Sequence, residues 1–281
     1  MNTAKTLTKF YKDPDFINSP DARTLRLLSE YLGPMSSFHR EKIKDTIVFF
    51  GSARAIPLAQ AEAEYQNLLK NQPNPDQFGE RKLEIAKMKI RLAKYYDDAV
   101  ELSRLLTEWS MSLAKKSRRF VVCSGGGPGI MEAANRGARL AGGKTIGLNI
   151  SLPFEQEPNE YISSELSFEF HYFFMRKYWF VYLAKALIVF PGGFGTMDEL
   201  MEVLTLVQTH KISKKMVVLL YGAQYWNELI NFDALVRWGT IDSEDLKLFQ
   251  FADSPQEAFN IVSSGLRRDY LNPSQNPTLL P

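Results

Sequence analysis

The 281-residue sequence contains one cysteine, three histidines and almost no net charge. Cys123 cannot form a disulfide within the chain, and its place in an apolar run predicts a buried structural thiol in a reducing compartment such as the cytoplasm. The histidines are scattered, so no metal site is expected. A balance of 34 basic against 32 acidic residues leaves +2, which is too little for a general attraction to nucleic acid or acidic membranes.

Long apolar segments are missing as well. The amino terminus has lysines but no apolar stretch of signal-peptide length, and the later apolar runs are short or interrupted by Lys185. We therefore expect neither secretion nor membrane spanning. Aromatic residues, by contrast, are concentrated: nine of the fifteen residues in 168–182 are aromatic.

Strands and helices alternate from residue 46 onward. Helices are predicted over 80–116, 172–185, 226–238 and 255–266, among others. The alternation predicts an α/β fold with a doubly wound, mainly parallel sheet flanked by helices. Short apolar runs predict its strands, at 46–50, 120–123, 144–150, 166–170, 186–190, 216–221 and 248–252.

The chain outside this alternation is expected to be peripheral. Residues 1–44 are predicted to form an N-terminal helical extension, with a helix over 20–40 and a break at Gly33-Pro34. The α/β domain would cover 45–270, and the proline-rich residues 271–281 would form a flexible tail.

Two glycine-rich turns follow strands at the sheet edge where ligands bind in this architecture. The first, Ser124-Gly-Gly-Gly-Pro-Gly129, lacks the spacing of a dinucleotide fingerprint, because the sixth position counted from Gly125 is Ile130. The next predicted strand also ends without an acidic residue, so a nicotinamide or flavin dehydrogenase is disfavoured. Glycines that merely permit a tight turn are the alternative interpretation.

The second turn, Pro191-Gly-Gly-Phe-Gly-Thr196, lacks the lysine of a nucleotide-triphosphate P-loop, so phosphoryl transfer from ATP is not expected. Its backbone N–H groups and the Thr196 hydroxyl suit a monophosphate. Glu199 has two interpretations: it closes a capping box with Thr196, or it projects into the crevice as a general base.

Arg176 is predicted to lie at the same edge. From Arg176 the helix returns toward the amino edge over about 14 Å, at about 1.5 Å per residue, and the next strand climbs back by about 16 Å. Half or more of the surrounding aromatic rings would be core, and one or two could stack on a base. These features predict a site for a nucleotide monophosphate or sugar phosphate.

The stretch Pro191-Gly-Gly-Phe-Gly-Thr-Met-Asp-Glu199 resembles the PGGxGTxxE signature of the LOG (Lonely Guy) family, long described as lysine decarboxylases. The pair Arg176-Lys177 resembles the family's second motif, and the resemblance covers about 45–265. It implies a Rossmann-like fold and hydrolysis of the N-glycosidic bond of nucleoside 5′-monophosphates, either AMP or a cytokinin riboside 5′-monophosphate, without a cofactor. Lysine decarboxylation would need a pyridoxal phosphate Schiff base, and no motif specifies one.

The resemblance also implies roles for individual residues and a homodimer or higher homo-oligomer. Arg176 and Glu199 would be catalytic. The phosphate would bind Gly192, Gly193, Gly195 and Thr196, and the rest of the nucleotide would lie near Gly51, Ser52, Gly126, Gly127, Glu132, Met175 and Lys177.

Two departures leave the base preference open. The run 173–177 has a phenylalanine where short plant-type members carry histidine, and the N-terminal helix and long helix resemble the larger bacterial forms. The alternative function is a non-catalytic carrier or sensor of a nucleotide-like ligand, of the molybdenum-cofactor-carrier type.

Overall fold

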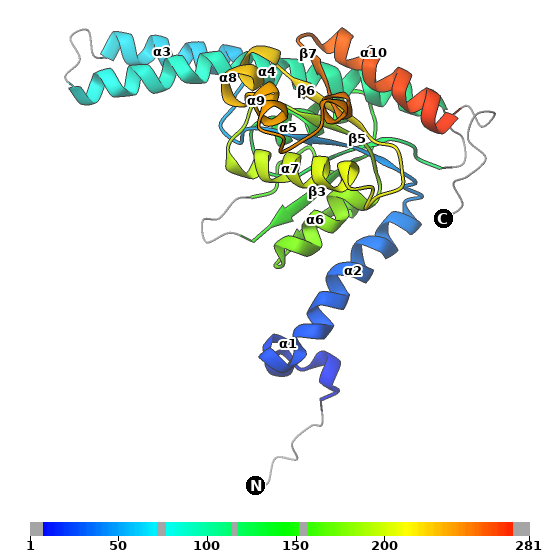
Figure 1. Cartoon of the computed structure of the whole chain (residues 1–281). Coiled ribbons are helices and arrows are strands. Elements are labelled where there is room, and N and C mark those ends of the chain that lie inside the picture. Colours follow the sequence, from blue (N-terminus) through cyan, green and yellow to red (C-terminus); the bar gives the residue numbers. More distant parts are fainter. Residues whose placement is uncertain (1–7, 72–76, 114–116, 152–156, 272–281) are drawn as a thin grey trace.

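The computed structural model describes residues 8–71, 77–113, 117–151 and 157–271. A seven-stranded parallel sheet lies at its centre (Figure 1), in the order β4-β3-β2-β1-β5-β6-β7. The chain winds outward from β1 in one direction and from β5 in the other, so the doubly wound α/β prediction is confirmed. The strands are β1 (Thr46–Phe50), β2 (Val121–Ser124), β3 (Thr145–Ile150), β4 (Ser167–Phe170), β5 (Ala184–Val189), β6 (Val217–Tyr221) and β7 (Gln250–Ala252).

Helices cover both faces of the sheet, because the strands bury side chains on both sides. In β1, Ile47 and Phe49 pack in one core with α4, α5 and α10, whereas Val48 and Phe50 pack in a second core with α6, α7 and α8. The ten helices of the described residues are α1 (Pro14–Asn18), α2 (Arg23–Arg40), α3 (Leu58–Asn71), α4 (Gln77–Leu113), α5 (Ile130–Leu140), α6 (Phe173–Tyr182), α7 (Phe194–Gln208), α8 (Ala223–Leu229), α9 (Phe232–Arg237) and α10 (Pro255–Leu266).

Two predicted helices differ from the structure, and a third helix was not predicted. Helix α6 ends at Tyr182 rather than at 185, because Ala184 already pairs with Thr46 at the start of β5. The helix predicted over 226–238 is two helices, since Ile230 is extended and the Asn231 side chain caps α9 by accepting the Ala234 amide at 2.9 Å. Helix α3, which packs along α4, has no counterpart in the prediction.

The break predicted at Gly33-Pro34 is also wrong, because α2 runs through both residues without interruption. A proline inside a helix removes the N–H that would bind the carbonyl four residues earlier, which here belongs to Glu30. That carbonyl instead accepts the indole N–H of Trp179 from α6, at 2.9 Å. A tertiary contact therefore compensates for the hydrogen bond that the proline cannot make.

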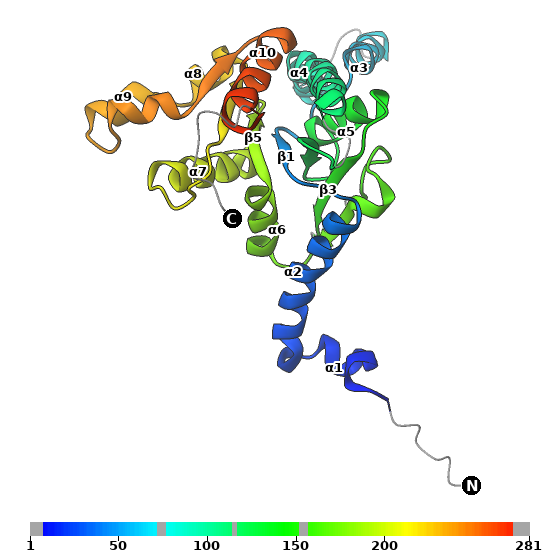
Figure 2. The same ribbon diagram turned by 90° about the vertical axis from the view of Figure 1, so that its right-hand side faces the viewer.

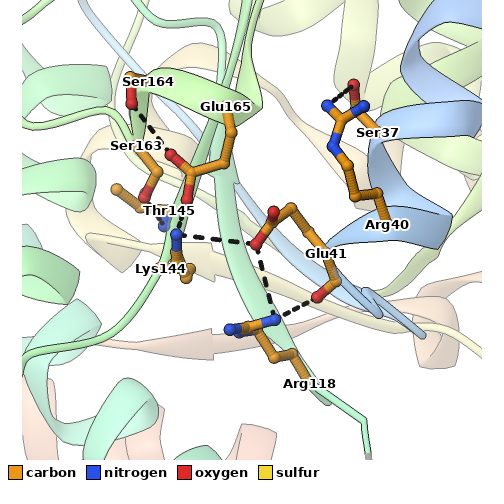
Figure 3. Close-up of polar contacts among 9 residues, drawn as sticks. All are labelled: Ser37, Arg40, Glu41, Arg118, Lys144, Thr145, Ser163, Ser164 and Glu165. Carbon is orange, nitrogen blue, oxygen red and sulfur yellow. Dashed lines mark hydrogen bonds and ion pairs between the residues drawn. The ribbon is translucent and has the colours of Figure 1, made fainter.

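Helix α2 projects away from the sheet, with its amino-terminal end outermost (Figures 1 and 2). Its carboxyl end is fixed by Glu41, whose carboxylate lies 3.7 Å from Arg118 and 3.6 Å from Lys144. Figure 3 shows this cluster, in which Lys144 also pairs with Glu165 and Arg118 donates to the Glu41 carbonyl. The extension is thus attached to the amino edge of the sheet by charged groups on several elements.

Some predictions lie outside the described residues, namely the tail beyond residue 271 and the end of the helix predicted to reach 116. The boundaries 1–44, 45–270 and 271–281 stay predictions. Cys123 is buried as expected. Among the described helices, none combines the length and apolar character needed to cross a membrane.

Candidate active site

The site lies where the winding of the sheet reverses, between β1 and β5. The turns that follow these strands are joined there, because the Ser52 amide donates to the Pro191 carbonyl at 2.9 Å. Such reversal points open a crevice at the carboxyl ends of the strands. A cavity of about 720 Å³ occupies this position, and nine of the residues predicted for the site line it: Gly51, Ser52, Gly127, Arg176, Gly192, Gly193, Gly195, Thr196 and Glu199.

The second glycine turn leads directly into α7. The helix begins at Phe194, and its N-cap residue, Gly193, has no side chain that could cap it. The first N–H groups of a helix have no partner within the helix, so this amino terminus presents donors and a positive dipole end. An added Cβ at Gly193 or Gly195 would meet open space, whereas one at Gly192 would meet the Thr196 side chain at 2.2 Å.

The capping-box interpretation of Glu199 is wrong. A capping box requires Thr196 at the N-cap, but Thr196 lies inside the first turn of α7 and Glu199 lies one turn further on. The Glu199 carboxylate lines the cavity instead, and the residue is 8% exposed. The second interpretation, a carboxylate facing the crevice, agrees with this position.

Glu199 is buried beside two cations from α6. Burial raises its pKa to about 7, against the lowering effects of Lys177 and Arg176. The Lys177 amine lies 3.9 Å from the Glu199 carboxylate. A carboxylate that titrates near neutral pH in a cavity has the protonation behaviour of a general acid or base.

Arg176 reaches the cavity from α6, at the edge where the strand geometry predicted it. Its Nε donates to the Leu148 carbonyl at 2.7 Å, and its Nη2 donates to the Gly125 carbonyl at 3.3 Å. The guanidinium also lies 5.0 Å from the centre of the Phe180 ring. Burial lowers the Arg176 pKa, and the charge of Glu199 opposes that effect. The contacts among the described residues leave guanidinium N–H donors for a ligand.

Lys177 joins α6 to α7 rather than lining the cavity. Its amine lies 2.8 Å from Asp198 and 2.7 Å from Glu202, in addition to its longer contact with Glu199. Three carboxylates of α7 therefore share one lysine of α6. This arrangement fixes the spacing of the two helices that carry Arg176 and Glu199.

Two glycines of the first turn are packed closely against protein atoms. Gly126 and Gly129 have positive φ angles, and a Cβ at these positions would lie 2.1 Å from the Asn149 side chain and 2.2 Å from the Ser52 carbonyl oxygen, respectively. The Ser52 carbonyl also accepts the Ile130 amide at the start of α5, at 3.0 Å. The interpretation of these glycines as permitting a tight turn therefore accounts for both positions.

Three further predicted residues lie away from the cavity lining. Glu132 accepts a hydrogen bond from the Tyr96 hydroxyl at 2.6 Å. Met175 packs against the core beneath α6, and Gly126 receives hydrogen bonds from the backbone and side chain of Asn159 at 2.9 Å. Their nucleotide-binding roles stay predictions.

The sequence argument missed several cavity residues. Arg54 follows Ser52 closely in the same turn, and Asn149 is a polar residue at the end of an apolar strand, so both had a weak signal. Tyr225 had no such signal, because it lies on α8, beyond the next strand in the chain. Its hydroxyl donates to the Gly192 carbonyl at 2.5 Å. The other missed residues are Phe50, Ala53, Leu92, Gly125, Met131, Ile150, Phe173, Phe194, Met197 and Asp198.

No group of three or more histidine, cysteine, aspartate or glutamate side chains placed to hold a metal ion is found in the described parts of the chain. The Lys177 amine forms ion pairs with the Asp198 and Glu202 carboxylates of α7.

Comparison with known proteins finds one family model, described as "Possible lysine decarboxylase", over residues 131–262. The chain is 31% identical over 173 residues to the cytokinin riboside 5′-monophosphate phosphoribohydrolase LOG of Oryza sativa subsp. japonica, covering 60% of this chain and 66% of the rice protein, just under two thirds of its length. It is 30% identical over 169 residues to a cytokinin riboside 5′-monophosphate phosphoribohydrolase of Arabidopsis thaliana, covering 58% of this chain and 71% of that protein.

Among solved structures, the molybdenum cofactor carrier protein of Chlamydomonas reinhardtii matches with a TM-score of 0.45 and 17% identity, covering 79% of this chain and 98% of that chain. A match at this TM-score and identity says nothing about function.

Proposed function

The chain belongs to the LOG family, and from this membership we propose that it hydrolyses the N-glycosidic bond of nucleoside 5′-monophosphates, releasing the free base and ribose 5-phosphate. The substrates would be AMP or a cytokinin riboside 5′-monophosphate. The observation that carries the proposal is that a helix amino terminus without a side-chain cap and a buried carboxylate, Glu199, lie on the same helix and line the same cavity.

The phosphate would bind at the amino terminus of α7. The backbone N–H groups of residues 194–196 have no acceptor within the helix and point to the open end, where the helix dipole favours an anion. Gly193 and Gly195 carry no side chain into the space beside them. A phosphate can therefore approach the backbone closely.

Glu199 would act on the sugar. With the phosphate held at the start of α7, the Glu199 carboxylate one turn later faces the ribose. Ionised, it would orient water and stabilise the positive charge of an oxocarbenium-like transition state, as carboxylates do in glycoside hydrolysis. Arg176, beside it and rigidly held, would orient the nucleotide through its remaining donors.

The test is incubation of the purified protein with AMP and other nucleoside monophosphates, with base release followed by chromatography. We expect release of the base and of ribose 5-phosphate. Glu199→Gln should lower kcat by at least about a hundredfold, because the ionised carboxylate acts in the transition state. The exposed Glu62 on α3 provides a matched control, and Glu62→Gln should leave the activity unchanged.

Tight binding of nucleoside monophosphates without release of any base would refute the hydrolase and support a non-catalytic carrier. A fully active Glu199→Gln protein would refute the role of Glu199 and leave the activity standing. Homodimer formation stays a prediction from the family resemblance. A cytoplasmic location stays a prediction from the single cysteine.

A further inference from the structure

Helix α6, which carries Arg176, is held at its amino end by the N-terminal extension. The Glu30 carboxylate of α2 accepts the amide of His171 at 2.9 Å and the amide of Tyr172 at 3.3 Å. These residues immediately precede α6, whose N-cap residue Tyr172 makes no side-chain capping bond. The helix dipole also favours a negative charge at this end.

The backbone of Glu30 contacts the same helix. Because Pro34 has no N–H group, the Glu30 carbonyl has no partner within α2 at that position and accepts the Trp179 indole N–H at 2.9 Å. Glu30 therefore holds α6 at two points, the residues immediately before its first turn and its second turn. The proline inside α2 is what makes the second contact possible.

The carboxyl end of α6 is held by Lys214, from the turn before β6. Its amine donates to the Val181 carbonyl and, at 2.8 Å, to the Tyr182 carbonyl. The last carbonyls of a helix have no partner within it, and a cation there is favoured by the dipole. The Thr46 amide donates to the next carbonyl, that of Leu183, at 3.0 Å.

Aromatic rings fill the space between α2 and α6. Tyr31 lies 5.7 Å from the ring centre of Tyr178 and 5.9 Å from that of Trp179, and Phe38 lies 5.3 Å from Trp179. Part of the aromatic cluster over 168–182 therefore packs against the extension. These contacts resist lateral movement of α6, while the hydrogen bonds of Glu30 and Lys214 resist movement along its axis.

We propose that Glu30 and Lys214 are positioning residues for Arg176, so that the N-terminal extension is part of the active-site framework. The proposal rests on the proposed function for its kinetic consequence. The Arg176 guanidinium reaches the Leu148 and Gly125 carbonyls by hydrogen bonds of 2.7 and 3.3 Å. A shift of α6 along its axis by about 1 Å would break the longer bond and displace the guanidinium relative to Glu199.

The kinetic test uses Glu30→Ala and Lys214→Met. We expect kcat to fall by about tenfold, since loss of one cap shifts α6 by only part of the 1 Å that can cost about a hundredfold. KM should change less than kcat, because the phosphate turn lies on α7. Lys214→Arg, which can still donate to both carbonyls, should recover most of the activity.

Two matched controls separate positioning from general attachment of the extension or loss of charge. Glu41→Gln weakens the ion pairs that fix α2 at its carboxyl end but touches nothing in α6. Lys211→Met removes an exposed lysine of the same turn as Lys214. Both should keep the wild-type kcat.

Amide hydrogen exchange tests the same proposal without any activity. Residues 171–178 should exchange faster in Glu30→Ala and residues 181–184 faster in Lys214→Met, while β1 keeps its protection. If the wild-type protein releases no base, the proposed function fails and the exchange result still decides whether α6 is held in this way. Unchanged exchange in α6, an equal fall in kcat in Glu41→Gln, or no recovery by Lys214→Arg would overturn the proposal.

Discussion

The two glycine-rich turns have similar sequences, but their glycines have different structural roles. In the first, residues 124–129, the space beside Gly126 and Gly129 is occupied by Asn149 and Ser52, although Gly125 and Gly127 line the cavity. In the second, residues 191–196, the space beside Gly193 and Gly195 is open and adjoins the cavity. Gly126 and Gly129 thus serve close packing, whereas Gly193 and Gly195 leave room for a ligand.

The largest effect expected from this difference is on folding, in the first turn. Gly129→Ala places a Cβ 2.2 Å from the Ser52 carbonyl oxygen at a φ of 72°. We expect a loss of about 3 kcal/mol or more in the free energy of unfolding, measured by denaturant titration, since backbone strain and a clash act together.

Gly142→Ala is the matched control, because Gly142 has a φ of 76° but nothing within 4 Å of an added Cβ. Strain alone should cost about 1 kcal/mol. Equal losses for the two variants would show that close packing is not what requires glycine at position 129.

The second effect concerns the carboxylate that follows the open turn. The pKa of Glu199 is raised from 4.5 to about 7, so the native state binds this proton more tightly than the unfolded chain does. The stability that this provides is present below pH 4.5 and is lost as the pH rises through 7. Glu199→Gln should therefore become more stable relative to the wild type between pH 4.5 and 8, by about 3 kcal/mol at most.

Thermal unfolding across this pH range measures the difference, and Glu62→Gln serves as the control for loss of one charge. The activity should depend on pH in the opposite sense, with kcat/KM rising to a plateau through a midpoint near pH 7 as Glu199 ionises. A stability difference that does not change with pH would contradict the raised pKa.

A third and smaller effect should appear in ligand binding. Gly193→Ala meets no protein atom within 4 Å, and the φ of −89° at this residue suits alanine, so the free energy of unfolding should change by less than about 0.5 kcal/mol. The methyl group would nevertheless keep a phosphate from the helix terminus. The Kd for AMP, measured by calorimetry, should rise about tenfold, as expected for loss of one charge-assisted hydrogen bond.

Gly33→Ala, on α2 and also without a neighbour within 4 Å, is the control for an added methyl group. Unchanged AMP affinity in Gly193→Ala would mean that the phosphate does not bind at the open turn, and the contrast between the turns would lose its functional meaning.

The smallest effect is expected for Tyr225, which supports the open turn through its hydroxyl. Tyr225→Phe removes the hydroxyl that donates to the Gly192 carbonyl. We expect a loss of about 1 kcal/mol in unfolding free energy and less than about a threefold rise in the Kd for AMP. A rise as large as that of Gly193→Ala would show that Tyr225 contacts the ligand itself.

Local patterns predicted much of the fold and part of the site. The strand β1 was predicted with its observed bounds, because five consecutive apolar or β-branched residues between polar ones leave little alternative to a buried strand. Arg176 was placed correctly because the rise per residue of helices and strands is nearly constant. The start of α7 was misjudged at Thr196, since a glycine can serve as the N-cap residue without any side-chain signal.

By itself, then, the sequence determined the parallel sheet, the two glycine turns and the edge at which Arg176 and Glu199 meet, because each follows from residues close together in the chain. Only the tertiary structure decided that Gly126 and Gly129 are closely packed while Gly193 and Gly195 face open space, and that Glu30 holds a helix more than a hundred residues away. The physical reason is that these properties depend on which atoms fill the space beside a backbone, and that space is bounded by distant segments whose packing no local periodicity specifies.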